Sequence, residues 1–119
     1  MSPYSLKKED LAQFFGTDNW YKHPLSKKIT YTDGVKYVAE NGGAYWLLDL
    51  IVLGQHVEEV AQEEFQLWVL KVSDNAAILT CDDGDGNIVY RKQIEHTDFP
   101  LDEIELWFTN DVILLPSEN

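Results

Sequence analysis

The sequence predicts an α+β domain, in which two or three N-terminal helices pack on an antiparallel sheet of four or five strands. Two observations lead to this prediction. Up to about residue 64, apolar residues recur at helical spacing, whereas from residue 65 onward short β-branched and aromatic segments alternate with turn residues. Helices first and strands afterwards is the pattern of an α+β domain.

The first helix is predicted over residues 5–15. Ser5 provides an N-cap, and Leu11, Phe14 and Phe15 follow at i, i+3 and i+4 spacing, which forms a single apolar stripe. A glycine directly after the stripe supplies a stop signal. The segment is therefore expected to be a short amphipathic helix.

The stretch 16–31 is predicted to be a loop. It mixes polar and aromatic residues, and Pro24 disfavours a helical conformation for the residue before it. Two short extended pieces are expected within this loop, near residues 20–22 and 29–31.

Two further helices are predicted in the next part of the chain. Thr32 and Asp33 can cap the first of them, which ends at the Asn-Gly-Gly sequence of residues 41–43. The segment 44–56 is apolar on nearly all sides, as expected of a helix buried in the centre of a domain. The acidic segment 57–64 either extends this helix or forms a short helix of its own.

Five short strands are predicted in the second half of the chain, because β-branched and aromatic runs are separated there by turn residues. They cover residues 65–72, 76–81, 87–96, 104–108 and 112–116. The core is expected to combine large apolar residues from both halves: Phe14, Trp46, Leu47, Leu50, Ile51, Trp68, Leu70, Ile78, Val89, Trp107 and Leu114.

Composition indicates a single compact domain over residues 1–119. The chain has 119 residues, of which 45% are hydrophobic, which suffices for a real core. Its single cysteine, Cys81, excludes an intramolecular disulfide. The start of the chain is charged, and the longest apolar run is far shorter than the about 20 residues of a bilayer span. We therefore expect a soluble, cytoplasmic protein without membrane contact.

The net charge of −12 is concentrated after residue 40. The first 40 residues hold six lysines and five acidic residues, whereas the remainder holds three basic residues and sixteen acidic ones. Such a surface repels nucleic acids and anionic lipids and attracts basic partners. Direct nucleic-acid binding is therefore not expected.

Several stretches resemble a family of small uncharacterised bacterial proteins that carry a domain of unknown function. They are FFGTDNWYKH, IEHTDFPL, VILLPSEN with its LPSE motif, and, most specific of all, TDGVKYVAENGGAYWLLDLI. The resemblance runs from about Phe14 to Glu118. Members of this family occur in cyanobacteria, other bacteria and mobile elements, and they usually end in LPSE plus an aromatic residue, where this chain has Asn119. The resemblance implies a compact domain and brings no activity with it.

The acidic stretch TCDDGDGNIVY, residues 80–90, could be a calcium-binding loop or a turn between two strands. Counted from Asp83, the first acidic positions of an EF-hand loop are Asp83 and Asp85, which fit. Ile88 stands, however, where a glycine is needed, and Ile94 where a bidentate carboxylate is needed. Strand-like sequence lies on both sides, so the stretch is interpreted as a glycine-rich hairpin turn.

Asp49 is the strongest single candidate for a functional residue. It lies within the apolar segment WLLDLIV, where an ionised carboxylate is costly to bury without a partner. It could be a catalytic acid with a raised pKa or a structural carboxylate that accepts hydrogen bonds from a loop, and the structural role is favoured. Tyr45 and His56 could border one pocket with Asp49, although His56 stands roughly 10 Å away along the helix.

The other reactive side chains give weak signals. The histidines His23, His56 and His96 have no HxH or HxxxH spacing, so a zinc site is only weakly indicated and no metal site is assigned. Cys81 stands next to acidic residues that oppose thiolate formation, so it is expected in the core. No P-loop, GxSxG or dinucleotide-binding glycine pattern occurs. No catalytic residue and no cofactor are assigned, and an enzyme is the less favoured interpretation.

Eleven acidic residues are predicted to form a partner-binding surface, although solvated acidic loops are the plainer interpretation. If they face one side of the molecule, they imitate spaced phosphates and fit a basic groove on another protein. They are Glu58, Glu59, Glu63, Glu64, Asp82, Asp83, Asp85, Asp98, Asp102, Glu103 and Glu105.

Three functional hypotheses follow. The first is a non-enzymatic acidic protein that engages a basic protein partner, for example as a nucleic-acid-mimicking inhibitor of host defence similar to anti-CRISPR proteins. The second is a small enzyme or ligand-binding domain, with a cavity of several hundred Å³ lined by Asp49. The third is a scaffold that self-associates into a homodimer through an edge strand such as 104–108.

Overall fold

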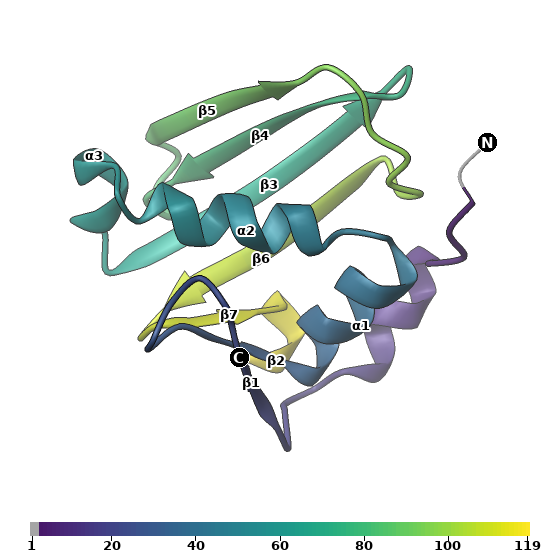
Figure 1. Ribbon diagram of the computed structural model, residues 1–119, viewed down its shortest axis with the longest axis horizontal. Helices are drawn as coiled ribbons and strands as arrows, with labels where there is room; N and C mark the ends of the chain where they lie inside the picture. The colour runs from purple at the N-terminus through teal and green to yellow at the C-terminus, as the bar shows by residue number, and fades with distance from the viewer. Residues whose placement is uncertain (1–2) are drawn as a thin grey trace.

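A seven-stranded mixed sheet forms the body of the protein, and helix α2 (Tyr45–Gly54) crosses one of its faces (Figure 1). The structure is a computed structural model and describes residues 3–119. The strand order is β1-β2-β7-β6-β3-β4-β5, and all neighbours are antiparallel except β2 and β7, which pair in parallel. The strands are β1 (Trp20–Lys22), β2 (Thr30–Thr32), β3 (Phe65–Ser73), β4 (Ala76–Asp82), β5 (Ile88–Ile94), β6 (Glu103–Thr109) and β7 (Val112–Leu114).

The helices are short, and most of them lie between the second and third strands in the sequence. Besides α2 they are the 3-10 helix η1 (Lys8–Gln13), α1 (Asp33–Asn41), α3 (Glu58–Ala61) and the 3-10 helix η2 (Pro116–Glu118). Helix α1 begins directly after β2, and the hydroxyl of Thr32 caps it by accepting a hydrogen bond from the backbone amide of Val35 at 3.3 Å.

The predicted arrangement of N-terminal helices on a four- to five-stranded antiparallel sheet is wrong. Two strands, β1 and β2, precede the α-helices and belong to the same sheet, and the parallel β2–β7 pair makes that sheet mixed. The extended pieces expected near 20–22 and 29–31 are these strands. Each has only three residues, which is too short for a period-two signal, and the β2–β7 pairing joins segments about 80 residues apart that no local pattern connects.

Strand β6 bears on the hypothesis of self-association through segment 104–108. It pairs with β3 along its whole length, but with β7 only over Trp107–Thr109. The backbone of residues 107–109 is therefore used on both sides within the sheet, whereas residues 103–106 pair with no described strand on the β7 side, and self-association through that part stays a prediction. The outer strands of the sheet are β1 and β5.

The predicted helix over residues 5–15 is replaced by the single 3-10 helix η1. Leu6 is buried, Leu11 and Phe14 are half-buried, and Phe15 is 81% exposed. The expected stripe thus contributes only in part to the core, because η1 ends at Gln13 and the extended backbone of Phe14 turns Phe15 away from the face of Leu11.

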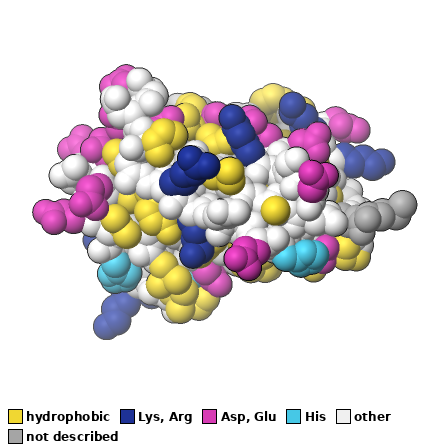
Figure 2. Space-filling view, turned by 90° about the horizontal axis from the view of Figure 1, so that it is seen from above, with side chains coloured by type: hydrophobic (Ala, Val, Ile, Leu, Met, Phe, Trp, Pro, Cys, Tyr) yellow, Lys and Arg dark blue, Asp and Glu magenta, His cyan; other side chains and the backbone are white. Residues whose placement is uncertain are grey.

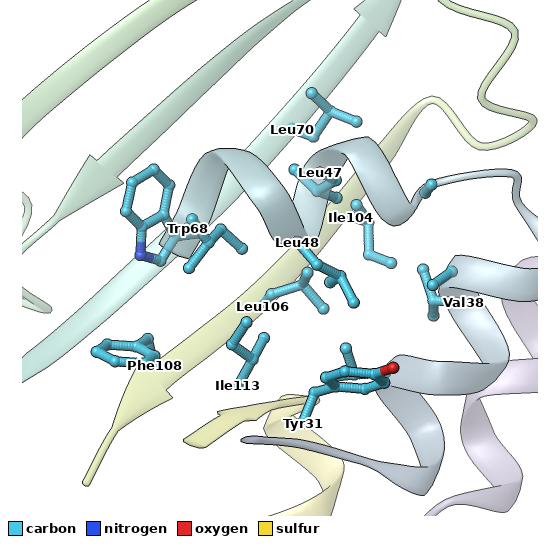
Figure 3. Close-up of a cluster of buried hydrophobic side chains, with 14 of the residues drawn as sticks. Tyr31, Val38, Leu47, Leu48, Trp68, Leu70, Ile104, Leu106, Phe108 and Ile113 are labelled. Atoms are coloured by element: carbon cyan, nitrogen blue, oxygen red, sulfur yellow. The ribbon is translucent and has the colours of Figure 1, made fainter. Parts of the chain in front are cut away.

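The core lies between the sheet and helices α1 and α2. Figure 3 shows Leu47 and Leu48 of α2 pointing toward Leu70, Ile104 and other strand residues. The prediction that helix α2 is buried on all sides is wrong, because Tyr45 is 44% and Leu53 is 50% exposed. One side of α2 packs on the sheet and the other faces solvent. Of the predicted core residues five are buried, namely Leu47, Ile51, Trp68, Leu70 and Leu114, and six are half-buried, namely Phe14, Trp46, Leu50, Ile78, Val89 and Trp107.

Candidate functional site

Seven of the eleven predicted partner-binding residues lie at one end of the sheet, where α3 stands next to the β4–β5 hairpin (Figure 1). A side chain placed at Gly84 in this hairpin would meet the ring of Phe65 at 2.9 Å, which brings the hairpin tip to the start of β3. The seven residues are Glu58, Glu59, Glu63, Glu64, Asp82, Asp83 and Asp85.

An eighth carboxylate, Asp111, joins this end of the sheet. Thr109 pairs with Phe65, so the tight β6–β7 turn that follows lies beside the start of β3. Asp111 has a φ of 60°, and its carbonyl oxygen accepts a hydrogen bond from the amide of Thr30 at 2.9 Å. The sequence predicts a tight turn at this position, but it does not predict the strand order that places the turn beside Phe65.

A hollow of about 480 Å³ opens at this end of the sheet. The carboxylates of Glu63, Glu64 and Asp111 line it, together with the amide groups of Gln55 and Asn110 and the cation of Lys28. Within residues 3–119, none of the eight carboxylates at this end forms an ion pair. The hollow therefore offers acceptors for a cationic group from another molecule.

Gln66 fixes the backbone that carries Glu63 and Glu64. Its side chain is buried, and its amide nitrogen donates to the carbonyl oxygens of Val60 at 2.9 Å and of Glu63 at 3.3 Å. Gln55 and Gln66 also exchange two reciprocal amide hydrogen bonds of 2.8 and 2.9 Å. The end of α2, helix α3 and strand β3 are thereby held in one arrangement.

The hairpin carboxylates are ordered by the backbone of their own turn. Asp82 accepts a hydrogen bond from the amide of Gly84 at 2.6 Å, and Asp83 accepts from the amide of Asp85 at 2.8 Å. The pKa of Asp83 is lowered from its ordinary value, chiefly because the side chain of Asn87 donates to it at 2.8 Å. The structure shows the hairpin turn that the sequence favoured over a calcium loop.

The four remaining predicted residues do not join the acidic end. Asp98, Asp102 and Glu103 lie at the opposite end of the seven-residue strands, and Glu105 lies two positions into β6. Strands of this length place the two groups on the order of 20 Å apart. Figure 2 shows acidic side chains at both ends of the face along β5, with lysine and arginine side chains between them. The predicted acidic residues thus form two groups and not one array.

Asp49 lines a different cavity, of about 600 Å³, between α2, the second half of β5 and the loop after it. Trp46, Leu50, Ile94 and Phe99 supply its apolar part, and Lys92, His96 and Asp98 stand with Asp49 as its charged or titratable groups. Tyr45 and His56 are exposed and do not belong to the lining in the described part of the chain. Only one of the three predicted pocket residues therefore lies in the cavity.

The carboxylate of Asp49 is bound to His23. The Nε2 atom of His23 lies 2.9 Å from Oδ1 of Asp49, and its Nδ1 atom accepts a hydrogen bond from the amide of Leu25 at 3.0 Å. Because Nδ1 is an acceptor, Nε2 carries the proton and donates it to Asp49. His23 is only 2% exposed, so this pair ties the loop after β1 to α2.

The remaining reactive groups are kept apart. Burial, reinforced by Asp82 and Glu63, raises the pKa of the Cys81 thiol to about 12, so the thiol stays protonated. His96 is exposed and lies 3.6 Å from Asp98. In residues 3–119 no three histidine, cysteine, aspartate or glutamate side chains come together as a metal site would require.

Comparison with known proteins assigns the chain to a family. The model of a family of unknown function, DUF6876, matches residues 5–119, which is nearly the whole chain. The chain belongs to this family. No curated protein and no solved structure matches it. In the described part of this DUF6876 chain, no helix has the length and hydropathy needed to cross a bilayer.

Proposed function

We propose that the protein is a non-enzymatic binding protein whose acidic end engages a basic protein partner. The acidic end consists of Glu58, Glu59, Glu63, Glu64, Asp82, Asp83, Asp85 and Asp111. The observation that carries the proposal is the hollow between Glu63, Glu64 and Asp111, whose carboxylates form no ion pair in the described residues, although Lys28 lines the same hollow.

A lysine or arginine side chain of the partner fits this hollow. Its charged group would meet several carboxylates at once, and charge-assisted hydrogen bonds of this kind are about twice as strong as neutral ones. The surrounding acids on α3 and on the β4–β5 hairpin would steer a basic surface toward the hollow and raise the association rate. Lys28 also lines the hollow and repels an incoming cation, so the partner's side chain must enter on the side of the carboxylates.

The partner that we propose is a nucleic-acid-binding protein of a bacterial cell. In this proposal the acidic end occupies the groove that would otherwise hold phosphates, as a nucleic-acid mimic does. A role as an inhibitor of host defence, as with the anti-CRISPR proteins of phages and mobile elements, is the specific form of the proposal. The net charge of −12 supports it.

The position of the reactive groups supports a non-enzymatic role. Asp49 and His23 satisfy each other, and the second nitrogen of His23 is used by a backbone amide. The thiol of Cys81 is buried and protonated. These groups therefore lack the free base or nucleophile that a hydrolytic or transfer reaction needs.

The test is binding to an arginine-rich peptide at low and at high salt. We expect binding at low ionic strength, lost as salt rises, and an affinity reduced about tenfold or more in the triple variant Glu63→Gln, Glu64→Gln, Asp111→Asn. The matched control is Asp98→Asn, Asp102→Asn, Glu103→Gln, which removes the same charge from the other end. Equal losses in both variants would mean that net charge alone attracts the peptide, and the proposal would fail.

A second function, binding of a small ligand, is favoured by the cavity along β5. Its volume of about 600 Å³ and its lining by Asp49 match the expectation for a ligand-binding domain. Lys92 lines the same cavity and forms no ion pair within residues 3–119, so it could hold an anionic group beside the apolar surface of Trp46. Titration with indole-3-acetate tests this: saturable binding that Lys92→Met removes supports it, and a linear response in both proteins contradicts it.

A further inference from the structure

The face of the sheet opposite α2 presents an apolar surface that helix α2 does not cover. Side chains alternate along each strand, so Trp68 and Leu70 of β3 are buried under the helices while their neighbours point to the other face. The apolar residues of this opposite face, here called the outer face, are half-buried: Phe65, Leu67, Val69, Ile78 and Trp107. The rings of Phe65 and Trp107 meet edge to face, with centroids 5.1 Å apart.

The strand register places one acid and one cation at opposite sides of the outer face. Glu105 of β6 pairs with Val69, Val69 pairs with Thr80, and Thr80 pairs with Arg91 of β5. Directly paired residues share a face, so all four side chains stand in one row across the sheet. Three strand spacings of about 4.8 Å separate the two charges, which therefore do not contact each other within one chain.

We propose that a second copy of this chain covers the outer face, related to the first by a two-fold axis that runs parallel to the strands between β3 and β4. This rotation exchanges β6 with β5 and β3 with β4. It sets Glu105 of each copy opposite Arg91 of the other, and Val69 opposite Thr80. Glu105 and Arg91, which do not contact each other within one chain, therefore form two opposite-charge pairs between the copies.

The neighbouring row of the sheet agrees with this arrangement. Trp107 pairs with Leu67, Leu67 with Asp82, and Asp82 with Ile88. The two-fold axis brings Trp107 of one copy over Ile88 of the other, and Leu67 over Asp82, which belongs to the acidic end. Ile88 is 57% exposed in the single chain, so the dimer would cover a large apolar side chain that is otherwise in water.

A recess beside Glu105 can receive the guanidinium group of the second copy. A hollow of about 370 Å³ lies between η1 and β6, and its charged lining consists of the carboxylates of Glu103 and Glu105 and the cation of Lys8. The carboxylate of Glu105 already accepts a hydrogen bond from Nε1 of Trp107 at 3.1 Å, which holds it in place. A carboxylate has further lone pairs, so it can accept from an arginine at the same time.

The size of the outer face predicts a weak dimer. Four strands about 4.8 Å apart, with seven residues of about 3.3 Å each, span on the order of 450 Å² per copy. Stable interfaces bury about 800 Å² per partner, so this contact belongs to the weak, reversible class. The dimer is therefore expected to form at high protein concentration and to dissociate on dilution.

Sedimentation velocity of the full chain over a range of concentrations tests the proposal. We expect a monomer–dimer equilibrium, weakened about tenfold or more by Glu105→Arg and by Arg91→Glu, and restored to within about threefold by the two together. Glu40→Arg makes the same charge change on α1, on the side of the sheet that the helices cover, and is expected to leave the equilibrium unaltered. Circular dichroism checks the fold of each variant. Glu105→Gln or Arg91→Gln takes the place of a charge-reversal variant that does not fold.

Three outcomes would overturn the dimer: a monomer at all concentrations, single variants that associate like the original chain, or a double variant that stays monomeric. Binding of a different protein to the outer face while the chain alone stays monomeric also counts against it. The two residues that carry the test, Glu105 and Arg91, do not belong to the acidic end. A failure here therefore leaves the proposed binding of a basic partner untouched.

Discussion

The carboxylate of Glu118 accepts a hydrogen bond from the backbone amide of Gly34 at 3.0 Å, so the second-last residue of the chain caps the start of helix α1. The same carboxylate accepts from the hydroxyl of Thr32 at 2.6 Å and from the amide of Leu115 at 2.9 Å. A helix N-terminus has unpaired amides and a positive dipole end, and a carboxylate satisfies both. The TDG and LPSE stretches, distant in sequence, thus form one contact.

We expect substitutions at this contact to destabilise the fold. Glu118→Ala removes three accepted hydrogen bonds and should lower the free energy of unfolding by about 2 kcal/mol. Gly34→Ala should also destabilise, because the added carbon would stand 2.6 Å from the side chain of Leu115. Gly16→Ala, which meets nothing within 4 Å, is the control. Urea unfolding measures all three, and equal stability of the Gly34 and Gly16 variants would refute the close contact.

The pair His23–Asp49 should show a measurable coupling. In a double-mutant cycle with His23→Ala and Asp49→Ala, we expect a coupling energy of about 1 kcal/mol, since the histidine is buried and the aspartate is 47% exposed. The exposed pair His96–Asp98, at 3.6 Å, serves as the comparison and should give a smaller value. Independent effects of the two His23–Asp49 substitutions would show that the hydrogen bond does not tie the loop to α2.

Asp33 should make stability fall at low pH. Hydrogen bonds from the Tyr21 hydroxyl at 2.8 Å and from the backbone of Asp18 lower the pKa of Asp33 from 3.8 to about 2. Because the pKa is lower in the folded state, the contribution is complete above pH 3.8 and is lost as the pH falls through about 2. Unfolding of Asp33→Asn, followed against pH, should vary less in this window. An identical pH profile in the variant would contradict this assignment.

Gln66 should control both stability and the acidic end. Replacement by leucine leaves Nε1–H of Trp68 without its partner and removes both amide hydrogen bonds with Gln55, which should cost about 2 kcal/mol. Gln62→Leu, at an exposed position on the same turn, is the matched control. Chemical unfolding measures stability, and peptide affinity shows whether the turn of Glu63 has moved. A Gln66→Leu variant as stable as the control would show that this amide network contributes little.

The second half of the fold could be predicted because its strands carry a local signal. In β3 and β4, short runs of apolar, β-branched and aromatic residues are bounded by turn residues, and their buried positions alternate along the strand. The order of these strands could not be predicted, because the return of β6 to the far side of β3 leaves no trace in local sequence. The same limit applies to the three-residue strands β1 and β2, since β1 pairs with β2 and β2 joins the sheet through β7.

For the candidate site, too, the sequence predicts which residues are present but not which of them lie together in the fold. The acidic residues were evident from the sequence, but their separation into two groups follows from which ends of the strands they occupy. Asp111 was missed because it reaches the acidic end only through the pairing of Thr109 with Phe65. His23, the partner of Asp49, lies 26 residues earlier in a stretch predicted to be a loop, so no helical spacing could connect the two.

The most direct test of the proposed function is a nuclear magnetic resonance titration of the isotope-labelled protein with an arginine-rich peptide. The account predicts that the largest chemical-shift changes fall on Glu63, Glu64 and Asp111, with smaller ones on α3 and on the β4–β5 hairpin. Asp98, Asp102 and Glu103 at the other end should change little. Equal changes at both ends, or changes centred on the cavity of Asp49 and Lys92, would contradict the claim that the acidic end is the binding surface.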